Sequence, residues 1–370
     1  MIREKIVALQ VLRFLACGGV IIHHALFLAR SVGVPRSSLA WSHVSEIGAA
    51  GVDVFFVISG FVIARTGPLA TPRPSSPQFL WRRWSRVAPL FFLISLFQIS
   101  IGQPMEWTRT LTTLLFWPVY GNHITAPYVG TGWTLCIEML FYVSVGAFLA
   151  IPRQKVGLVI GGIVIIGLLF LRLLVDSVAL RYIANPVFLE FGAGVLLALG
   201  WSRLQKVPVN VGMILVVAVV GAFLAEAIVG SAGAAGASMF IHDGSEFVHV
   251  FVRVLVFGLP STALVVGIVI VGRDWSGGIV RPFEFLGDAS YSLYLTHPFV
   301  NAALATMMMG HHVQSWQVVS ASIALAFSSG VFVYLAVERP LRTWLRAVRP
   351  WWSHAPSTEL LQDGHPAQNA

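Results

Sequence analysis

Long runs of apolar residues, separated by short polar segments, repeat along almost the whole chain. Ten of them are long enough to cross a bilayer as helices, which takes about 20 residues. Their approximate cores are residues 7–29, 47–65, 79–101, 133–151, 156–175, 182–200, 208–229, 248–272, 286–309 and 317–337. The run Leu111–Tyr120 is too short to span and contains Pro118, so we expect it to be interfacial or re-entrant. The pattern predicts an all-α polytopic membrane protein.

Composition agrees with this pattern. Hydrophobic residues make up 56% of the 370 residues and charged residues only 11%, with a mean hydropathy of +0.79. Soluble globular proteins have about 25% charged residues. The net charge of +8 could suit a nucleic-acid partner, but the basic residues lie in short loops between apolar runs, so we expect none. Cys17 and Cys136 both fall inside predicted spans, which argues against a disulfide framework.

The distribution of lysine and arginine predicts the orientation. With the N-terminus in the cytoplasm, most of the 24 basic residues fall in inner segments, as the positive-inside rule requires. An eleventh span at residues 111–120 would place the C-terminal arginines outside, so parity favours ten spans with both ends cytoplasmic. No small-residue cleavage site follows the first run, so we expect it to stay as a membrane helix. We therefore expect a membrane domain over residues 1–345, a disordered cytoplasmic tail over 346–370 and an outer linker at Gly230–Ser238.

Ionisable residues inside membrane spans are costly and are therefore candidates for function. In the first span, Arg13 and His24 share one helix face about 16 Å apart, whereas His23 points about 100° away. Asp53 lies about as deep as His24 from the outer surface, so its carboxylate could fix the histidine tautomer and raise its basicity. Glu138 lies near the same level and competes as that partner, or could orient an acceptor hydroxyl. The alternatives are a snorkelling arginine with a histidine bonded to a neighbouring carbonyl, and, for Asp53, a buried ion pair without catalysis.

Three arginines form a basic block at the inner end of the third span. Arg82, Arg83 and Arg86 stand at helical spacing beside tryptophans, with Arg82 and Arg86 expected on one face. Such guanidiniums suit a phosphorylated anionic ligand. A basic anchor in an interfacial tryptophan belt would look the same.

Other polar positions in the spans are ambiguous or weaker candidates. Tyr291, Tyr294 and His297 fit either a substrate site or an ordinary span with hydrogen-bonded tyrosines. We expect Ser59 and Gly60 to mark a close helix contact. The remaining acids are Glu190 and Glu226, which belong to no polar constellation in the sequence, and Glu338, which we expect to form an ion pair with Arg339.

Six motifs in order resemble those of the acyltransferase family 3 integral membrane proteins, which include polysaccharide and lipopolysaccharide O-acetylases. They are the Arg-x10-His pair, Gly51–Gly60, Arg82–Pro89, Trp133–Tyr142, Ser290–His297 and Glu338–Pro340. The resemblance runs from about residue 5 to 345. One such motif would be weak evidence, but six in the family's order are specific. Within the family, the chain looks most like the exopolysaccharide acetylases of rhizobia.

The resemblance implies an O-acyltransferase, most simply an O-acetyltransferase, in the cell inner membrane. It would move an acyl group from coenzyme A (acetyl-CoA) to a hydroxyl of a cell-surface or lipid-linked carbohydrate such as exopolysaccharide, without a metal. His24 would be a general base or a transient acyl carrier, oriented by Asp53 or Glu138. The expected donor-binding residues are Arg13, Arg82, Arg83 and Arg86, and the expected substrate-binding residues are Trp133, Tyr294 and His297.

Two other classes of function use the same residue types. A proton-coupled exporter of a polyol or glycan would use intramembrane His, Asp and Glu as a proton relay. A haem-binding electron carrier could use His23 or His24 together with His297 as axial ligands. Three observations distinguish the three classes. Consumption of a thioester indicates the acyltransferase, substrate flux without thioester consumption indicates the exporter, and a Soret absorption band indicates the haem-binding carrier. The glycan acceptor and the oligomeric state are not set by the sequence.

Overall fold

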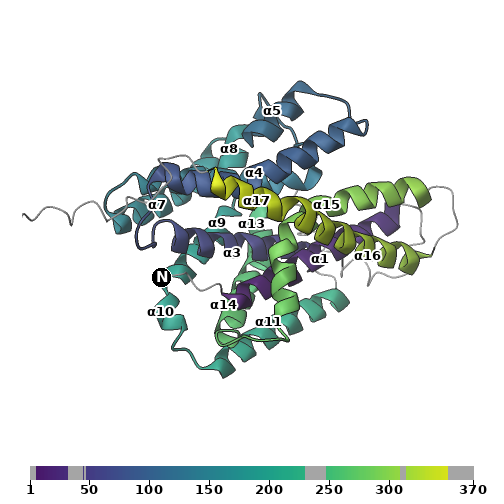
Figure 1. Cartoon of the computed structure of the whole chain (residues 1–370). Coiled ribbons are helices and arrows are strands. Elements are labelled where there is room, and N and C mark those ends of the chain that lie inside the picture. The colour runs from purple at the N-terminus through teal and green to yellow at the C-terminus, as the bar shows by residue number, and fades with distance from the viewer. Residues whose placement is uncertain (1–5, 32–44, 46, 230–246, 309–313, 349–370) are drawn as a thin grey trace, which may run out of the picture.

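The computed structural model describes residues 6–31, 45, 47–229, 247–308 and 314–348. In this part, the chain folds into a helical bundle, and the predicted all-α architecture is confirmed (Figure 1). The only strands in the described ranges are β1 (Val119–Tyr120) and β2 (His123–Ile124), which pair antiparallel. The predicted linker at Gly230–Ser238 and the tail from residue 349 onward lie outside the described residues.

The bundle is built from long helices joined by short connections. The α-helices are α1 (Val7–Ser31), α3 (Gly51–Thr66), α4 (Ser76–Ser100), α5 (Trp107–Leu115), α6 (Trp133–Leu149), α7 (Gln154–Leu174), α8 (Val178–Ile183), α9 (Phe188–Leu199), α10 (Trp201–Leu204), α11 (Val209–Val229), α13 (Phe247–Arg253), α14 (Leu259–Val271), α15 (Arg281–Met308), α16 (Ser315–Val333) and α17 (Arg339–Ala347). The 3₁₀ turn η1 (Gly130–Gly132) precedes α6, and the π-helical turns η4 (Val254–Gly258) and η5 (Tyr334–Glu338) continue α13 and α16.

Eight helical segments in the described residues are long and apolar enough to cross a membrane. They are Val7–Ser31, Ile47–Thr66, Gly130–Leu149, Val156–Leu174, Val178–Leu199, Val209–Glu226, Val250–Val271 and Ser315–Leu345. The other two predicted spans correspond to α4 and α15, continuous helices of 25 and 28 residues that carry more polar and charged side chains. The chain is therefore a multi-pass membrane protein.

Several predicted boundaries are refined by the structure. The span expected at residues 182–200 consists of α8 and α9, separated where Asn185 and Pro186 interrupt the helix. The short run at 111–120 ends α5, a helix of only 9 residues, and continues into β1. The expectation that this run does not span is confirmed.

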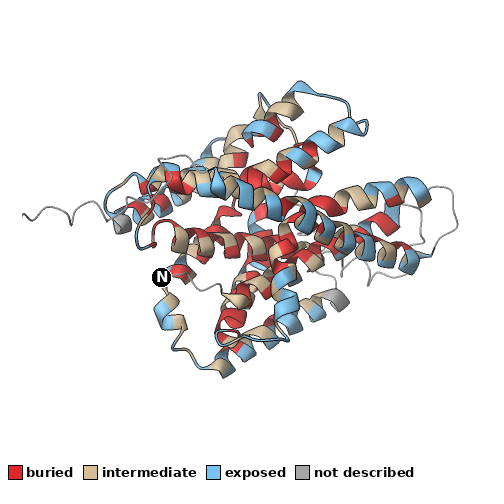
Figure 2. Cartoon of the chain, in the orientation of Figure 1, coloured by how far each residue is buried: buried red, intermediate tan, exposed pale blue. Residues whose placement is uncertain are grey.

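Helix α3 lies at the centre of the bundle, where most of its residues are buried (Figure 2). It packs along α9, and two glycines allow this contact. A Cβ atom on Gly60 would lie 2.0 Å from the Phe191 carbonyl oxygen, and one on Gly194 would lie 2.1 Å from that of Val57. Close backbone approach through small residues is typical of membrane helices. The expected helix contact at Gly60 is therefore confirmed.

Helix α1 packs along α15, α3 and α16, which brings the first and ninth predicted spans together. By contrast, α7 and α11 expose most of their apolar side chains at the edge of the bundle. Such a surface belongs in lipid, because hydrocarbon outside the helix replaces the packing that a soluble core would provide. Most of the polar residues of interest lie on the buried side, many of them between α1, α3, α4, α6 and α15.

Candidate functional site

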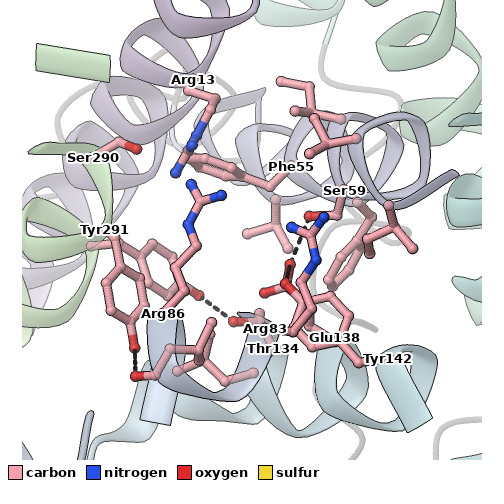
Figure 3. A pocket seen from close by; sticks show the side chains of 18 residues that line it. Arg13, Phe55, Ser59, Arg83, Arg86, Thr134, Glu138, Tyr142, Ser290 and Tyr291 are labelled. Atoms are coloured by element: carbon pink, nitrogen blue, oxygen red, sulfur yellow. Dashed lines mark hydrogen bonds between the residues drawn. The ribbon is translucent and has the colours of Figure 1, made fainter. Parts of the chain in front are cut away.

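Side chains of α1, α3, α4, α6 and α15 line a cavity of about 110 Å³ (Figure 3). Much of its wall is apolar, including Phe55, Phe56 and Leu135. The polar groups on the wall come from all five helices. They are Arg13, Ser59, Arg83, Arg86, Thr134, Glu138, Tyr142, Ser290, Tyr291 and Tyr294.

Local sequence positions the arginines of α4. Ser75 caps the helix by accepting a hydrogen bond from the Gln78 backbone N–H, while the Gln78 side chain accepts one from the Ser75 N–H. The helix that starts there directs Arg83 and Arg86, three residues apart, into the cavity. Arg82 is exposed and does not line it. The expected shared face for Arg82 and Arg86 is therefore wrong for this cavity: the inward pair is Arg83 and Arg86.

Arg13 and Arg86 point toward each other across the cavity (Figure 3). Within the described part of the chain, neither guanidinium has a hydrogen-bond or ion-pair partner. Arg83 differs, because it donates to the Thr66 hydroxyl and lies over the rings of Phe79 and Tyr142. Two facing guanidiniums repel each other in a water-poor site, and an anion bound between them would relieve this repulsion. The arrangement fits a ligand with one or more negative groups.

Glu138 lies in the same cavity as the arginines and not beside His24. One of its carboxylate oxygens, Oε1, accepts hydrogen bonds from the Ser59 hydroxyl at 2.7 Å and the Tyr142 hydroxyl at 2.6 Å. Ser59 is thus part of the site, which corrects its interpretation as a helix contact only. A signal was present in the sequence: Thr134, Glu138 and Tyr142 are spaced four residues apart and share one face of α6.

His24 belongs to a second group, formed by α1 and α15. Its Nδ1 lies 2.9 Å from the Val20 carbonyl oxygen, and its ring lies 4.9 Å from the ring of His297, centroid to centroid. The His23 ring is 4.8 Å from that of His24, but its Nδ1 turns to the Ser45 carbonyl oxygen at 2.6 Å. His297 is fully buried, and its Nε2 has no partner in the described ranges. We call His23, His24 and His297 the histidine group.

Asp53 does not reach His24 in this structure. Its Oδ2 accepts a hydrogen bond from Arg253 Nη2 at 2.7 Å, and both side chains are fully buried. Glu190, on α9, is buried close to this pair, although the sequence placed it in no polar constellation, and neither of its carboxylate oxygens has a hydrogen-bond partner among the described residues. The predicted His24–Asp53 pair is thus replaced by an ion pair 200 residues apart in the sequence. The alternative His24–Glu138 pair is not formed either.

The remaining predicted residues lie around these groups. Tyr294 lines the cavity, and its ring also lies 5.8 Å from that of His297, so it touches both groups. Trp133 starts α6 and packs against the core without lining the cavity. The ion pair expected between Glu338 and Arg339 is wrong, because Glu338 pairs with Arg342 at 3.0 Å and accepts a hydrogen bond from Ser292.

Comparison with known proteins decides the class. The family described as the acyltransferase domain matches residues 6–337 of the chain. The chain belongs to this family. It is therefore an acyltransferase, and the resemblance seen in the motifs is confirmed. This assignment separates it from the proton-coupled exporter and the haem-binding carrier.

Two curated relatives align with the chain. The chain is 30% identical over 328 residues to the exopolysaccharide production protein ExoZ of Rhizobium meliloti (strain 1021). The matched region covers 83% of this chain and 93% of the relative. The chain is 25% identical over 199 residues to nodulation protein 10 of Rhizobium leguminosarum bv. viciae, covering 45% and 53%. No solved structure matches the chain.

Proposed function

We propose that this acyltransferase moves an acetyl group from acetyl-CoA to a hydroxyl of a cell-surface or lipid-linked carbohydrate, such as exopolysaccharide, in the cell inner membrane. The observation that carries the choice of donor is the facing pair Arg13 and Arg86. Coenzyme A has phosphates that would occupy the space between two unpaired guanidiniums. The name of the relative from Rhizobium meliloti supports exopolysaccharide as the acceptor.

The catalytic step belongs to the histidine group in this proposal. His24 acts as general base on the acceptor hydroxyl or carries the acyl group transiently. It lies on the same face of α1 as Arg13, about 16 Å farther along the helix. A donor with phosphates at one end and its acyl group at the other would bridge this distance. Glu138 would hold Ser59 and Tyr142 in the wall of the donor cavity, and Asp53 would contribute through its ion pair with Arg253.

The donor assignment is tested by steady-state kinetics with labelled acetyl-CoA in membranes of matched expression. Arg86→Ala and Arg13→Ala should raise the donor KM by about 10- to 100-fold, the effect of losing a charge-assisted hydrogen bond. Arg82→Ala is the matched control, since Arg82 lies on the same helix but outside the cavity. Its donor KM should stay near that of the wild type. Arg86→Lys should recover binding only in part, because an ammonium lacks the planar fork of a guanidinium.

An unchanged donor KM in a well-folded Arg82→Ala/Arg86→Ala variant would return the arginine block to a membrane anchor. The acceptor is tested separately, by mass spectrometry of the surface glycan from cells with and without the gene. Loss of acetyl groups from that glycan, restored by the wild-type gene, is the expected result. A glycan with unchanged acetylation would exclude it as the acceptor.

A further inference from the structure

Tyr294, which is hydrogen-bonded to Thr134, lies between the arginine cavity and the histidine group. The Tyr294 hydroxyl lies 3.0 Å from Thr134 Oγ1 and donates to the Thr131 carbonyl oxygen at 3.1 Å. One side of Tyr294 faces the cavity, and its ring contacts His297, which in turn contacts His24. Tyr294 therefore closes the cavity on the side of the histidines.

Helix α1 runs past this closure. Cys17 lies one turn beyond Arg13, about 40° around the helix, so it stands between Arg13 and His24 on nearly the same face. Its thiol donates to the carbonyl oxygen of Ser290, a residue that lines the cavity, at 3.4 Å. Cys17 has no exposed surface. It thus lies on α1 between the two groups and contacts a residue of the cavity wall.

The chemistry of the closing pair matches the middle of the proposed donor. In a coenzyme A thioester, an arm with two amide groups joins the phosphates to the acyl group. Each hydroxyl of Thr134 and Tyr294 has one donor and acceptor lone pairs, so together they can serve an amide N–H and an amide C=O. In this structure, the two hydroxyls bond to each other and share the Thr131 carbonyl oxygen as an acceptor, which avoids unpaired polar groups inside the protein.

We propose that Thr134 and Tyr294 form the subsite for the amide-bearing arm of the acyl donor. The two hydroxyls release each other when the arm enters, and the Tyr294 ring moves aside so that the acyl end reaches His24. This subsite rests on the proposed function, since it assumes that the phosphates bind between Arg13 and Arg86. It adds the residues that receive the donor between those arginines and the histidine.

The native cysteine allows a test that requires no turnover. The full-length protein, purified in detergent, is treated with methyl methanethiosulfonate, and modification of Cys17 and Cys136 is followed by peptide mass spectrometry. Tyr294→Phe and Thr134→Val each remove the closing hydrogen bond and should speed modification of Cys17 by about two- to tenfold. The double variant should be less fast than the two single effects combined, because both single variants remove the bond between the two hydroxyls in addition to each hydroxyl's own bond to the Thr131 carbonyl oxygen.

Two variants serve as controls. Tyr291→Phe removes a hydroxyl on the same helix, in the same cavity, but that hydroxyl donates to the Val87 carbonyl oxygen at 2.7 Å. Thr134→Ser keeps the hydroxyl. In both variants, the reagent should modify Cys17 at the wild-type rate. Cys136, also buried, reports general loosening of the bundle. The proposal that Tyr294 closes the cavity would be overturned by either of two results. One is that Tyr291→Phe and Tyr294→Phe speed the modification of Cys17 equally, and the other is that modification is sped equally at Cys17 and Cys136.

The ligand arm of the experiment uses two probes. Desulfo-coenzyme A carries the phosphates and also the arm, but no reactive thiol. Adenosine 3′,5′-bisphosphate carries phosphates without the arm. Binding of each is measured by calorimetry. At saturation, desulfo-coenzyme A should speed the modification of Cys17 at least about threefold more than the bisphosphate does. The reason is that only desulfo-coenzyme A has an arm that enters the subsite and separates the two hydroxyls. Equal effects of two bound probes would overturn the subsite, whereas binding of neither would overturn the coenzyme A assignment itself.

Discussion

At the scale of single residues, His23 and His24 are controls for each other. They are adjacent on α1 and half-buried, yet only His24 contacts His297, whereas His23 turns to the Ser45 carbonyl oxygen. We expect His24→Ala to lower acetyl transfer by about 10²- to 10⁴-fold, the usual cost of losing a general base. His23→Ala should keep the rate within about tenfold of wild type.

The measurement is acetyl transfer from labelled acetyl-CoA in membranes with equal amounts of each variant. If the His23→Ala variant were inactive and the His24→Ala variant active, the assignment of the chemistry to the His24 face of α1 would be wrong. His297→Ala would then be the next variant to measure, since its ring also belongs to the histidine group.

The buried pair Asp53–Arg253 has a matched counterpart on the surface. Asp176 and Arg181 form an ion pair of similar length, 2.6 Å against 2.7 Å, but the Asp176 side chain is 74% exposed and Asp53 is fully buried. Asp53→Asn leaves a buried guanidinium without its counter-ion, so it should destabilise the protein by about 3–5 kcal/mol. Asp176→Asn should leave the melting temperature unchanged, because water and salt screen an exposed pair.

Thermal unfolding in detergent measures both effects. The double variant Asp53→Asn/Arg253→Met should recover much of the lost stability, because it removes the unpaired charge as well. If Asp53→Asn melts like the wild type while transfer is lost, Asp53 acts in the chemistry and not through its ion pair.

At the scale of helices, the α3–α9 contact offers a test on a single helix. Gly194 and Gly192 both lie on α9, but a Cβ on Gly194 would meet the Val57 carbonyl oxygen at 2.1 Å, whereas one on Gly192 meets nothing within 4 Å. Gly194→Ala should lower the free energy of unfolding by about 1–3 kcal/mol, the cost of overpacking. Gly192→Ala should be neutral or stabilising by up to about 1 kcal/mol. The measurement is thermal unfolding of both variants in detergent. Equal slopes of the two unfolding transitions would allow their stabilities to be compared directly.

At the scale of the whole molecule, the positive-inside rule predicts the orientation in the membrane. We expect the β1–β2 hairpin outside and the connection between α14 and α15 inside. Asn122→Cys and Ser276→Cys place a thiol at an exposed position in each of these two segments. An impermeant maleimide applied to intact cells should label Asn122→Cys and spare Ser276→Cys. The reverse result would invert the orientation and put the proposed donor and acceptor on the wrong sides.

The sequence by itself determined the class of protein and most of its elements. Apolar runs of membrane length predict helices because a bilayer leaves no other way to satisfy the backbone of a single segment. Spacing along one helix carries information too: Thr134, Glu138 and Tyr142 recur every four residues and line one cavity, although this repeat did not enter the prediction. These features depend only on the local periodicity of the chain.

Which polar groups meet was decided by the tertiary structure. Equal depth suggested that His24 and Asp53 are neighbours, but Asp53 pairs with Arg253, while Glu138 lies in the cavity with the arginines. Depth gives one coordinate of a side chain, and the packing of helices gives the other two. A buried charge then takes the partner that packing places beside it, because leaving it unpaired costs several kcal/mol. The sequence therefore contained the ionisable residues of this site, and the arrangement of α3, α6, α9 and α15 chose their partners.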